Sequence, residues 1–290
     1  LSAAGASVGL GNIWRFPYLA AKYGGGIFLL VYIILALTFG YTLIMAETSL
    51  GRMTRKSPVG AFESFGNSRF ISIGGWINAT IPILIVPYYS VIGGWVIKYL
   101  IEYFAGHSKT LAGDAYFTTF ISNGWSTEIC FIIFTLFTLG IIYAGVRNGI
   151  ERVSKFMMPI LIVLSLIIAV YSVTRPGAIE GVKYFLVPNF DHFSWMTVVS
   201  AMGQMFYSLS IAMGILITFG SYMKKDTSIE KSTENVEIFD TAIAIMAGLM
   251  IIPAVFAFSG GNAETLKSGP ALMFITIPKV FANMGFGTAI

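Results

Sequence analysis

The sequence predicts an all-α protein that crosses a membrane several times. Hydrophobic residues make up 56% of its 290 residues and charged residues only 11%, with a mean hydropathy of +0.78. A soluble domain carries about 25% charged residues, so most soluble classes are excluded. Seven apolar stretches approach or exceed the roughly 20 residues that a helix needs to cross the hydrocarbon layer.

The apolar stretches follow one another along the whole chain. They lie near residues 1–22, 27–50, 76–104, 128–145, 156–173, 197–221 and 238–259. The tail is mixed, with a turn predicted at 261–264 and a short amphipathic helix at 271–284. The first stretch begins abruptly and the tail looks re-entrant, so we expect a single transmembrane domain over 1–290 that is truncated at both ends.

The basic residues predict how the chain is oriented. The loops after the second, fourth and sixth stretches hold ten of them: Arg52, Arg55, Lys56, Arg69, Arg147, Arg152, Lys155, Lys224, Lys225 and Lys231. Cytoplasmic loops carry an excess of Lys and Arg, so the chain should start on the cytoplasmic side of the cell (inner) membrane. The net charge of +4 is spread over loops, and nucleic acid is therefore not an expected partner.

The first stretch contains residues that break a helix. Gly5, Gly9 and Gly11 fall within seven residues, and each glycine costs about 1 kcal/mol relative to alanine in a helix. A broken helix at membrane depth is tolerated only where its free backbone groups line a cavity or bind something. Packing against another helix would explain Gly5 and Gly9, but not Asn12 or the ionisable Arg15 beside them. The motif therefore favours a ligand site.

The segment 9–18, with glycines at 24–26, resembles the first span of the neurotransmitter:sodium symporter family. Further matches follow in order at 47–52, 87–89, 148–152 and 203–210. The resemblance implies an inverted-repeat transporter fold with discontinuous first and sixth spans. The first repeat would cover about 1–173, and the second would start within about 197–290, with its later spans absent.

The resemblance also implies a function. Bacterial leucine-transporter-like members are sodium-coupled amino-acid symporters that work by alternating access. Monoamine carriers of the family have an aspartate at the position of Gly9, and a glycine leaves room for a substrate that brings its own carboxylate. We therefore expect symport of a neutral amino acid, apolar or aromatic. Which amino acid it is, the sodium stoichiometry and any proton antiport stay open.

The family pattern places the substrate between the two broken spans. The amides of Leu10 and Gly11 would receive its carboxylate at the positive end of a half-helix. The other implied substrate contacts are Ser7, Gly9, Ile85, Tyr89, Tyr207, Ser208, Ser210 and Met213. Tyr89 and Tyr207 would form an aromatic lid. Ile85 and Met213 are equally explained as packing residues.

One or two sodium ions are implied as well. The first site would use the Ser7 carbonyl, the Asn12 amide oxygen, Ser208, Asp240 and the substrate carboxylate. Because substrate and sodium share that ligand, each raises the affinity for the other. The second site would take the carbonyls of Gly5 and Val8, with its remaining ligands in a later span.

Asp240 bears on the need for chloride. The chloride-site equivalents are Tyr32, Gln204, Ser208, Asp240 and Ala244, and many relatives have asparagine at 240 and serine at 244. We hypothesise that Asp240 supplies the negative charge that chloride supplies elsewhere, so that chloride is not required. At about 4 Å and an effective dielectric near 20 such a charge interacts with sodium by about 4 kcal/mol. The alternative is a helix-end aspartate that caps the seventh span.

Gates and alternative functions complete the expectations. Arg15, Tyr89 and Tyr207 would close the outer side, and Tyr222 matches a position below the site. A membrane amino-acid sensor or a channel needs similar features and stays open. An enzyme is not expected, because no nucleophile with a base is visible in the apolar stretches. The partners are the lipid bilayer and a small amino acid, and a homo-oligomer is possible.

Overall fold

The computed structural model describes residues 9, 11–66, 68–113, 115–145, 149–259 and 271–283. The regular elements in these ranges are helices, and one isolated antiparallel bridge joins Gly25 to Pro188. Five helical segments are long and apolar enough to cross a membrane: Gly26–Thr54, Arg69–Phe104, Gly124–Tyr143, Glu151–Val173 and Ile229–Phe258. They correspond to the second to fifth and the seventh predicted spans. The all-α fold with several spans is thus confirmed.

The described part of the first predicted span forms a short irregular helix. η1 (Gly11–Arg15) is a π-helix, and α2 (Phe16–Lys22) continues from it. The Gly9 carbonyl accepts the backbone N–H groups of Asn12 and Ile13 at 3.1 and 3.2 Å. Turns of the π type are rare and frequently lie at functional sites. The glycine-rich motif thus forms the irregular backbone that its composition predicts.

The second span also contains a π-helix. It consists of α3 (Gly26–Leu35), η2 (Ala36–Gly40) and α4 (Tyr41–Thr54). At its start Gly25 has a positive φ of 59° and lies against α11, where a Cβ atom would overlap the Tyr184 carbonyl oxygen. Only glycine fits such a position without strain, which accounts for the glycines at 24–26.

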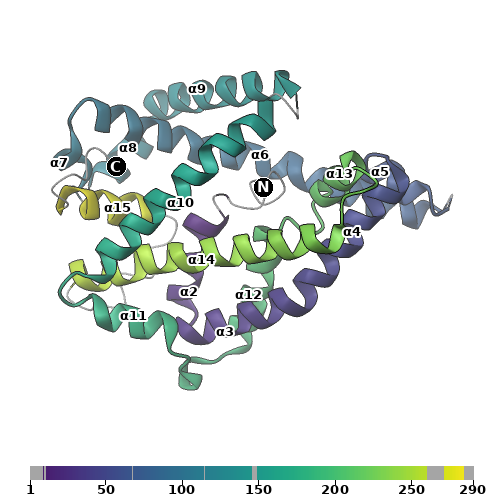
Figure 1. The fold of residues 1–290 in the computed structure, drawn as a ribbon. Coiled ribbons are helices and arrows are strands. Elements are labelled where there is room, and N and C mark those ends of the chain that lie inside the picture. The colour runs from purple at the N-terminus through teal and green to yellow at the C-terminus, as the bar shows by residue number, and fades with distance from the viewer. Residues whose placement is uncertain are drawn as a thin grey trace.

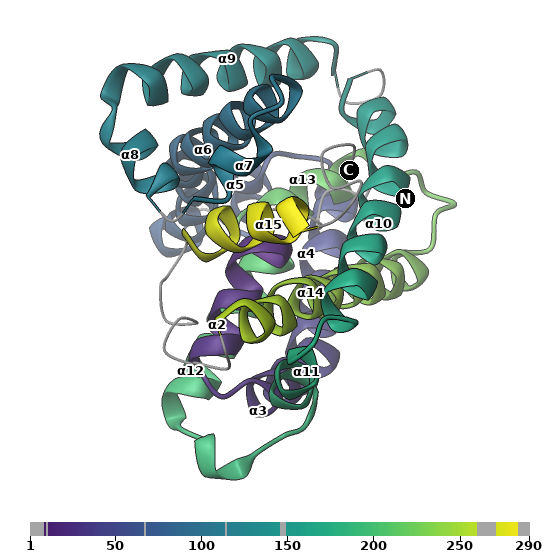
Figure 2. The same cartoon turned by 90° about the vertical axis from the view of Figure 1, so that its left-hand side faces the viewer.

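The next helices form a layer at one edge of the molecule. α6 (Arg69–Phe104) pairs with α9 (Gly124–Tyr143), as Figures 1 and 2 show, and α5 (Pro58–Glu63) packs on α6. The loop between α6 and α9 holds α7 (Ser108–Leu111) and α8 (Tyr116–Ser122). Large apolar side chains such as Leu136 and Phe137 are exposed on α9. A soluble monomer rarely exposes a large apolar patch, whereas lipid accommodates it.

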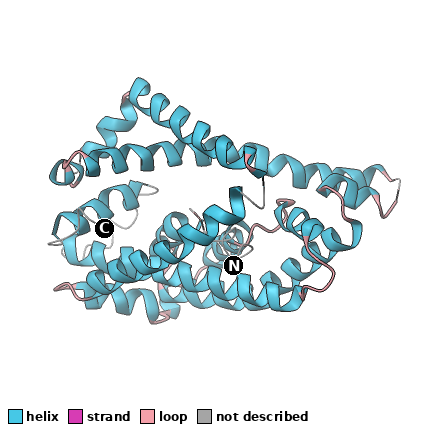
Figure 3. Cartoon of the chain, turned by 45° about the horizontal axis from the view of Figure 1, so that its top comes forward, coloured by secondary structure: helices cyan, strands magenta, loops and turns pink. Residues whose placement is uncertain are grey.

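The seventh span, α14 (Ile229–Ser259), lies at the centre of the fold (Figure 1). It packs against η1, α2, α4, α10 and α11, and against the last described helix. Figure 3 shows that helices make up nearly all of the described chain. The remaining elements are α10 (Glu151–Val173), α11 (Ala178–Leu186), η4 (Phe190–His192), α12 (Trp195–Ser208), α13 (Ile215–Tyr222) and α15 (Ala271–Asn283).

The sixth predicted span is two short helices rather than one. α12 ends at Ser208 and α13 begins at Ile215, and between them Ser210, Ala212 and Gly214 have φ values of 57°, 60° and 68°. Residues other than glycine rarely adopt this left-handed conformation, and it persists where the surroundings hold it. The span is therefore discontinuous, as the resemblance implied.

Two helices begin at least seven residues before their apolar stretches. α6 starts at Arg69 rather than near 76, and α14 starts at Ile229 rather than near 238. Both extensions carry polar or charged residues, which a search for apolar residues leaves out. The tail helix predicted at 271–284 is observed as α15, whereas the turn predicted at 261–264 lies outside the described residues. The division into two repeats stays a prediction.

Candidate functional site

Asp240 of α14 is the centre of a buried polar cluster. The side chain is fully buried, and its two oxygens lie 2.9 and 3.0 Å from the Ser208 hydroxyl, which donates to them. The Tyr32 hydroxyl donates to Oδ2 at 3.0 Å, and Asn12 Nδ2 donates to Oδ1 at 2.8 Å. These donors come from α12, α3 and η1. The cluster therefore joins both irregular spans to the second and seventh spans.

This geometry rules out the alternative role of Asp240 as a helix-end cap. α14 begins at Ile229, eleven residues earlier, which is about three turns. A capping carboxylate accepts the free N–H groups of the first turn. Asp240 instead accepts side-chain donors from other spans. The helix-end alternative was wrong because polar residues extend α14 beyond its apolar stretch.

The Asn12 side chain links the irregular first span to α14 through its Nδ2 atom. Its Nδ2 also donates to the Asp240 carbonyl at 3.0 Å, and its Oδ1 accepts the Gly9 amide at 3.1 Å. Asn12 is fully buried and Ser208 is nearly so. The structure thus brings together three of the predicted residues of sodium site one, namely Asn12, Ser208 and Asp240. The other predicted contacts of this region, Gly5, Ser7, Val8 and Leu10, lie outside the described residues.

The chloride-site equivalents separate into two groups. Tyr32 and Ser208 contact Asp240, and Ala244 is buried one turn further along α14. Gln204 is also buried but points to η1: its Nε2 donates to the Gly11 carbonyl at 2.8 Å, and its Oε1 accepts from Arg15 at 3.1 Å. Gln204 therefore braces the first span rather than Asp240.

Aromatic rings and Arg15 lie above this cluster. The ring centroids of Tyr89 and Tyr207 are 6.1 Å apart, and the Arg15 guanidinium lies 4.7 Å from the centroid of Tyr207. Arg15 also donates to the Gly203 carbonyl at 3.3 Å. A cation over an aromatic ring is worth about 0.5–2 kcal/mol, more when desolvated. The structure thus places the three predicted outer-gate residues together.

The remaining predicted site residues lie around the break in the sixth span and beyond it. Ser210 is in the break, and Ile85 and Met213 are half-buried. Tyr222 ends α13 with 68% of its surface exposed, and it makes none of the ring contacts found for Tyr89 and Tyr207. The structure therefore does not join Tyr222 to the other gate residues.

Two side chains that sequence reasoning gave no role hold the break in the sixth span. The Glu47 carboxylate accepts the Ala212 amide at 2.7 Å, and the Asn78 side-chain oxygen accepts the Gly214 amide at 3.1 Å. Free backbone groups at membrane depth need such partners. The signal was present, because a carboxylate or an amide within an apolar span is costly and usually functional.

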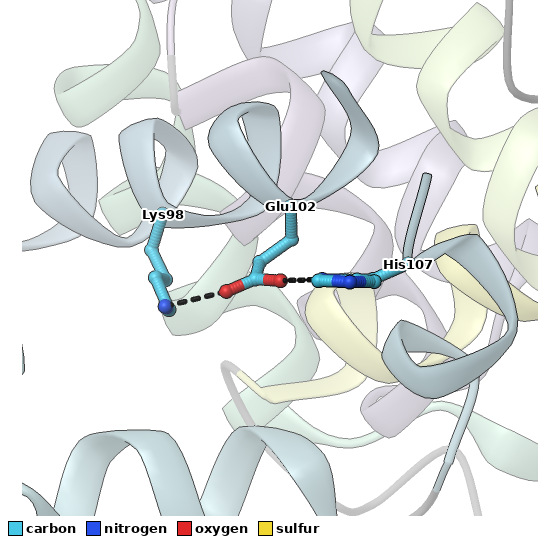
Figure 4. Close-up of polar contacts among 3 residues, drawn as sticks. All are labelled: Lys98, Glu102 and His107. Carbon is cyan, nitrogen blue, oxygen red and sulfur yellow. Dashed lines mark hydrogen bonds and ion pairs between the residues drawn. The ribbon is translucent and has the colours of Figure 1, made fainter. Parts of the chain in front are cut away.

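A further polar cluster lies at the predicted outer end of α6. The Glu102 carboxylate contacts Lys98 Nζ and His107 Nδ1, each at 2.6 Å (Figure 4). His107 directly precedes α7, whose Leu111 packs with Phe117, Phe274 and Trp14 in one apolar cluster. The contacts of Glu102 thus fasten α7, whose Leu111 packs in one cluster with Trp14 of the first span.

Comparison with known proteins agrees with this architecture. The chain matches the sodium:neurotransmitter symporter family model over residues 1–131 and 116–290. It is 35% identical to the uncharacterized sodium-dependent transporter YhdH of Bacillus subtilis and 32% identical to an uncharacterized sodium-dependent transporter of Haemophilus influenzae. Both alignments cover 99% of this chain. They cover 64% of the length of the Bacillus subtilis protein and 65% of the length of the Haemophilus influenzae protein.

A solved structure is similar along almost the whole chain. The crystal structure of MhsT in complex with L-phenylalanine superimposes with a TM-score of 0.92 and 36% identity, covering 99% of this chain and 65% of that one. The chain thus spans somewhat less than two thirds of the length of these relatives. The family consists of transporters, which confirms that the chain is not an enzyme. This multi-pass membrane chain belongs to the sodium:neurotransmitter symporter family.

Proposed function

We propose that the full protein containing this chain is a sodium-coupled symporter of a neutral amino acid, apolar or aromatic. It works by alternating access in the inner membrane, with the start of this chain on the cytoplasmic side. The observation that carries the proposal is the Asp240 cluster, which joins both irregular spans through buried oxygen atoms. Phenylalanine bound to the similar MhsT supports a substrate of this class.

Sodium fits the chemistry of the Asp240 cluster. The cluster offers carboxylate, hydroxyl and amide oxygens, and none of the ion pairs found within the described part of the chain involves Asp240. A buried charge is costly unless it is paired, so a cation would stabilise this carboxylate. Site one consists of Asn12, Ser208, Asp240, the Ser7 carbonyl and the substrate carboxylate. A second ion would take the carbonyls of Gly5 and Val8.

The substrate carboxylate binds the amides of Leu10 and Gly11. Support comes from Gly11, where an added Cβ would lie 3.1 Å from the Tyr207 ring, so that the backbone lies directly under the aromatic lid. Gly9, Ser210, Ile85 and Met213 complete the proposed pocket. Because sodium and substrate share the carboxylate, binding of either raises the affinity for the other by the same factor.

Asp240 makes chloride unnecessary in this mechanism. Its carboxylate is fixed by Tyr32 and Ser208, which are chloride-site equivalents, and Ala244 beside it lacks a hydroxyl. The charge that balances sodium therefore belongs to the protein. Arg15, Tyr89 and Tyr207 close the outer side over the bound substrate. Tyr222 is the proposed inner-gate residue below the site.

The proposal is tested by uptake into proteoliposomes that hold the full-length protein. Labelled L-phenylalanine within an amino-acid mixture is supplied with sodium or with potassium outside. We expect accumulation with sodium only. Sodium-dependent binding without accumulation would instead identify a sensor, and steady currents far exceeding substrate flux would identify a channel. Either result would refute the proposed symport.

A further inference from the structure

A buried polar face of α14 leads from Asp240 toward the predicted cytoplasmic end of the helix. Thr233, Glu237 and Asp240 are spaced four and three residues apart, so they share one side of the helix. Their exposed fractions are 1%, 5% and 0%. With a rise of about 1.5 Å per residue, Glu237 lies about 4.5 Å along the axis from Asp240 and Thr233 about 10 Å.

Glu237 differs from Asp240 in its lack of partners. Its Oε1 atom is buried without a hydrogen bond, and so is the Thr233 hydroxyl. Neither residue takes part in the ion pairs of the described chain. An unpaired carboxylate in an apolar surrounding is costly, and an ionisable group at membrane depth usually marks an ion or proton path. A negatively charged Glu237 therefore needs one positive charge beside it, and the ion pairs of the described chain do not supply one.

The helix that carries Glu237, α14, packs against the irregular part of the second span. The titratable groups whose charges interact with Glu237 are Asp240 on the same helix and the hydroxyls of Tyr32 and Tyr41 on the second span. Tyr32 precedes η2 and Tyr41 follows it, and η2 packs against α14. A π-helix inside a longer helix is frequent at functional sites. Glu237 thus lies about one turn from Asp240 on the helix that packs against the π-helical segment η2.

We propose that Glu237 and Thr233 form a further site for one monovalent cation, sodium or a proton, on the cytoplasmic side of Asp240. Glu237 supplies the negative charge. The Thr233 hydroxyl is an oxygen ligand for sodium and a hydrogen-bond acceptor for the protonated acid. The inference rests on the proposed function, because the site gives a cation leaving or approaching Asp240 a position nearer the cytoplasm.

Variants of the full-length protein test this site. Glu237→Gln removes the charge, and Thr233→Val removes only the hydroxyl. The matched control is Glu234→Gln, because Glu234 is exposed on the same helix. Retained sodium-dependent binding of L-phenylalanine shows that each variant is folded. The measurements are the number of radioactive sodium ions bound per protein, and the protons exchanged across the membrane during uptake.

If sodium occupies the site, Glu237→Gln binds one sodium ion fewer than the wild type, and Thr233→Val weakens that ion's affinity. If a proton occupies it, the sodium count stays the same and Glu237→Gln loses the proton exchange. Either outcome supports the site, provided that Glu234→Gln behaves as the wild type. Unchanged sodium count and proton exchange in Glu237→Gln would overturn it.

Failure of the proposed function is a separate result. Wild-type protein that shows no sodium-driven uptake would refute symport. The count of bound sodium ions on purified protein would still decide whether Glu237 holds a sodium ion. Proton release from purified protein, followed with a pH-sensitive dye as sodium is added, would decide whether it holds a proton.

Discussion

At the scale of single residues, Asp240 shows how a membrane protein keeps a charge in its core. Three donors from three different spans stabilise the carboxylate, and a hydrogen bond to a charged group contributes about 1.5–3 kcal/mol. Those donors hold the carboxylate in place, but they do not neutralise its negative charge. Asp240 is therefore suited to bind a cation that comes and goes, because its own geometry does not depend on that cation.

Gly11 lies where the backbone and the aromatic lid meet. We predict that Gly11→Ala lowers the affinity for L-phenylalanine by about tenfold or more, which corresponds to about 1.4 kcal/mol. An added Cβ would lie 3.1 Å from the Tyr207 ring, so that the ring has to move off the site. Equilibrium binding to the purified full-length protein measures this effect.

The matched control for Gly11 is Gly140→Ala in α9. A Cβ on Gly140 meets no atom within 4 Å, and we expect binding to stay within about twofold, since surface substitutions usually change little. Equal affinities for Gly11→Ala and Gly140→Ala would show that the close approach of Gly11 to Tyr207 does not position the lid.

Most of the residues that form the Asp240 cluster could be predicted from the sequence. Tyr32, Asn12, Ser208 and Asp240 meet as the family pattern implied. The orientation of Gln204 could not be anticipated, because a buried amide turns to whichever carbonyl and donor lie nearest, and here those belong to η1. Which partners lie nearest depends on the packed fold and not on the spacing of residues.

At the scale of elements, the break in the sixth span depends on side chains from other helices. Glu47 of α4 and Asn78 of α6 accept the amides of Ala212 and Gly214. A buried N–H group left without a partner costs about 1–3 kcal/mol. The break is therefore a supported structure, held by the second and third spans. The apolar stretch at 197–221 by itself predicted one continuous helix, and only the family resemblance implied the break.

We predict that Asn78→Ala destabilises the full-length protein by about 1–3 kcal/mol, because the Gly214 amide loses its acceptor. Thermal unfolding in detergent, compared with the wild type, measures the change. The control is Asn283→Ala, since Asn283 is exposed and donates only within its own helix. Equal melting temperatures for both variants would contradict a supporting role of Asn78.

Helix boundaries were the weakest part of the element predictions. α14 extends nine residues before its apolar stretch through a segment with exposed Glu230, Lys231 and Glu234. Charged residues that lie outside the hydrocarbon layer do not end a helix. They only end the apolar stretch from which a span is predicted. That difference excludes the alternative that placed Asp240 at a helix end, because Asp240 lies eleven residues inside α14.

At the scale of the whole molecule, the sequence predicted an all-α protein with several spans but not which of them lie inside. α9 and α14 are both strongly apolar. In the fold α14 is enclosed, while α9 exposes large side chains such as Leu136. Close approach to α14 needs small residues: a Cβ on Gly248 would overlap the Phe185 ring of α11. Such pairings form only across the folded chain.

The orientation of the chain is predicted from the excess of basic residues in its inner loops. Lys224 and Lys183 are both exposed and are predicted to lie on opposite sides of the membrane. In intact cells an impermeant maleimide should label Lys183→Cys and leave Lys224→Cys unlabelled until the membrane is opened. Native Cys130 is buried and serves as background. Labelling of Lys224→Cys alone would reverse the assigned orientation.

The central claim is that Asp240 supplies the negative charge at a sodium-coupled amino-acid site. The most direct test is sodium-driven uptake of L-phenylalanine by the full-length protein, with and without chloride. We predict that the wild type works without chloride, and that Asp240→Asn loses most uptake. Combined with Ala244→Ser, which restores the hydroxyl of chloride-requiring relatives, Asp240→Asn should regain uptake only when chloride is present. Chloride-dependent uptake by the wild type would contradict the account.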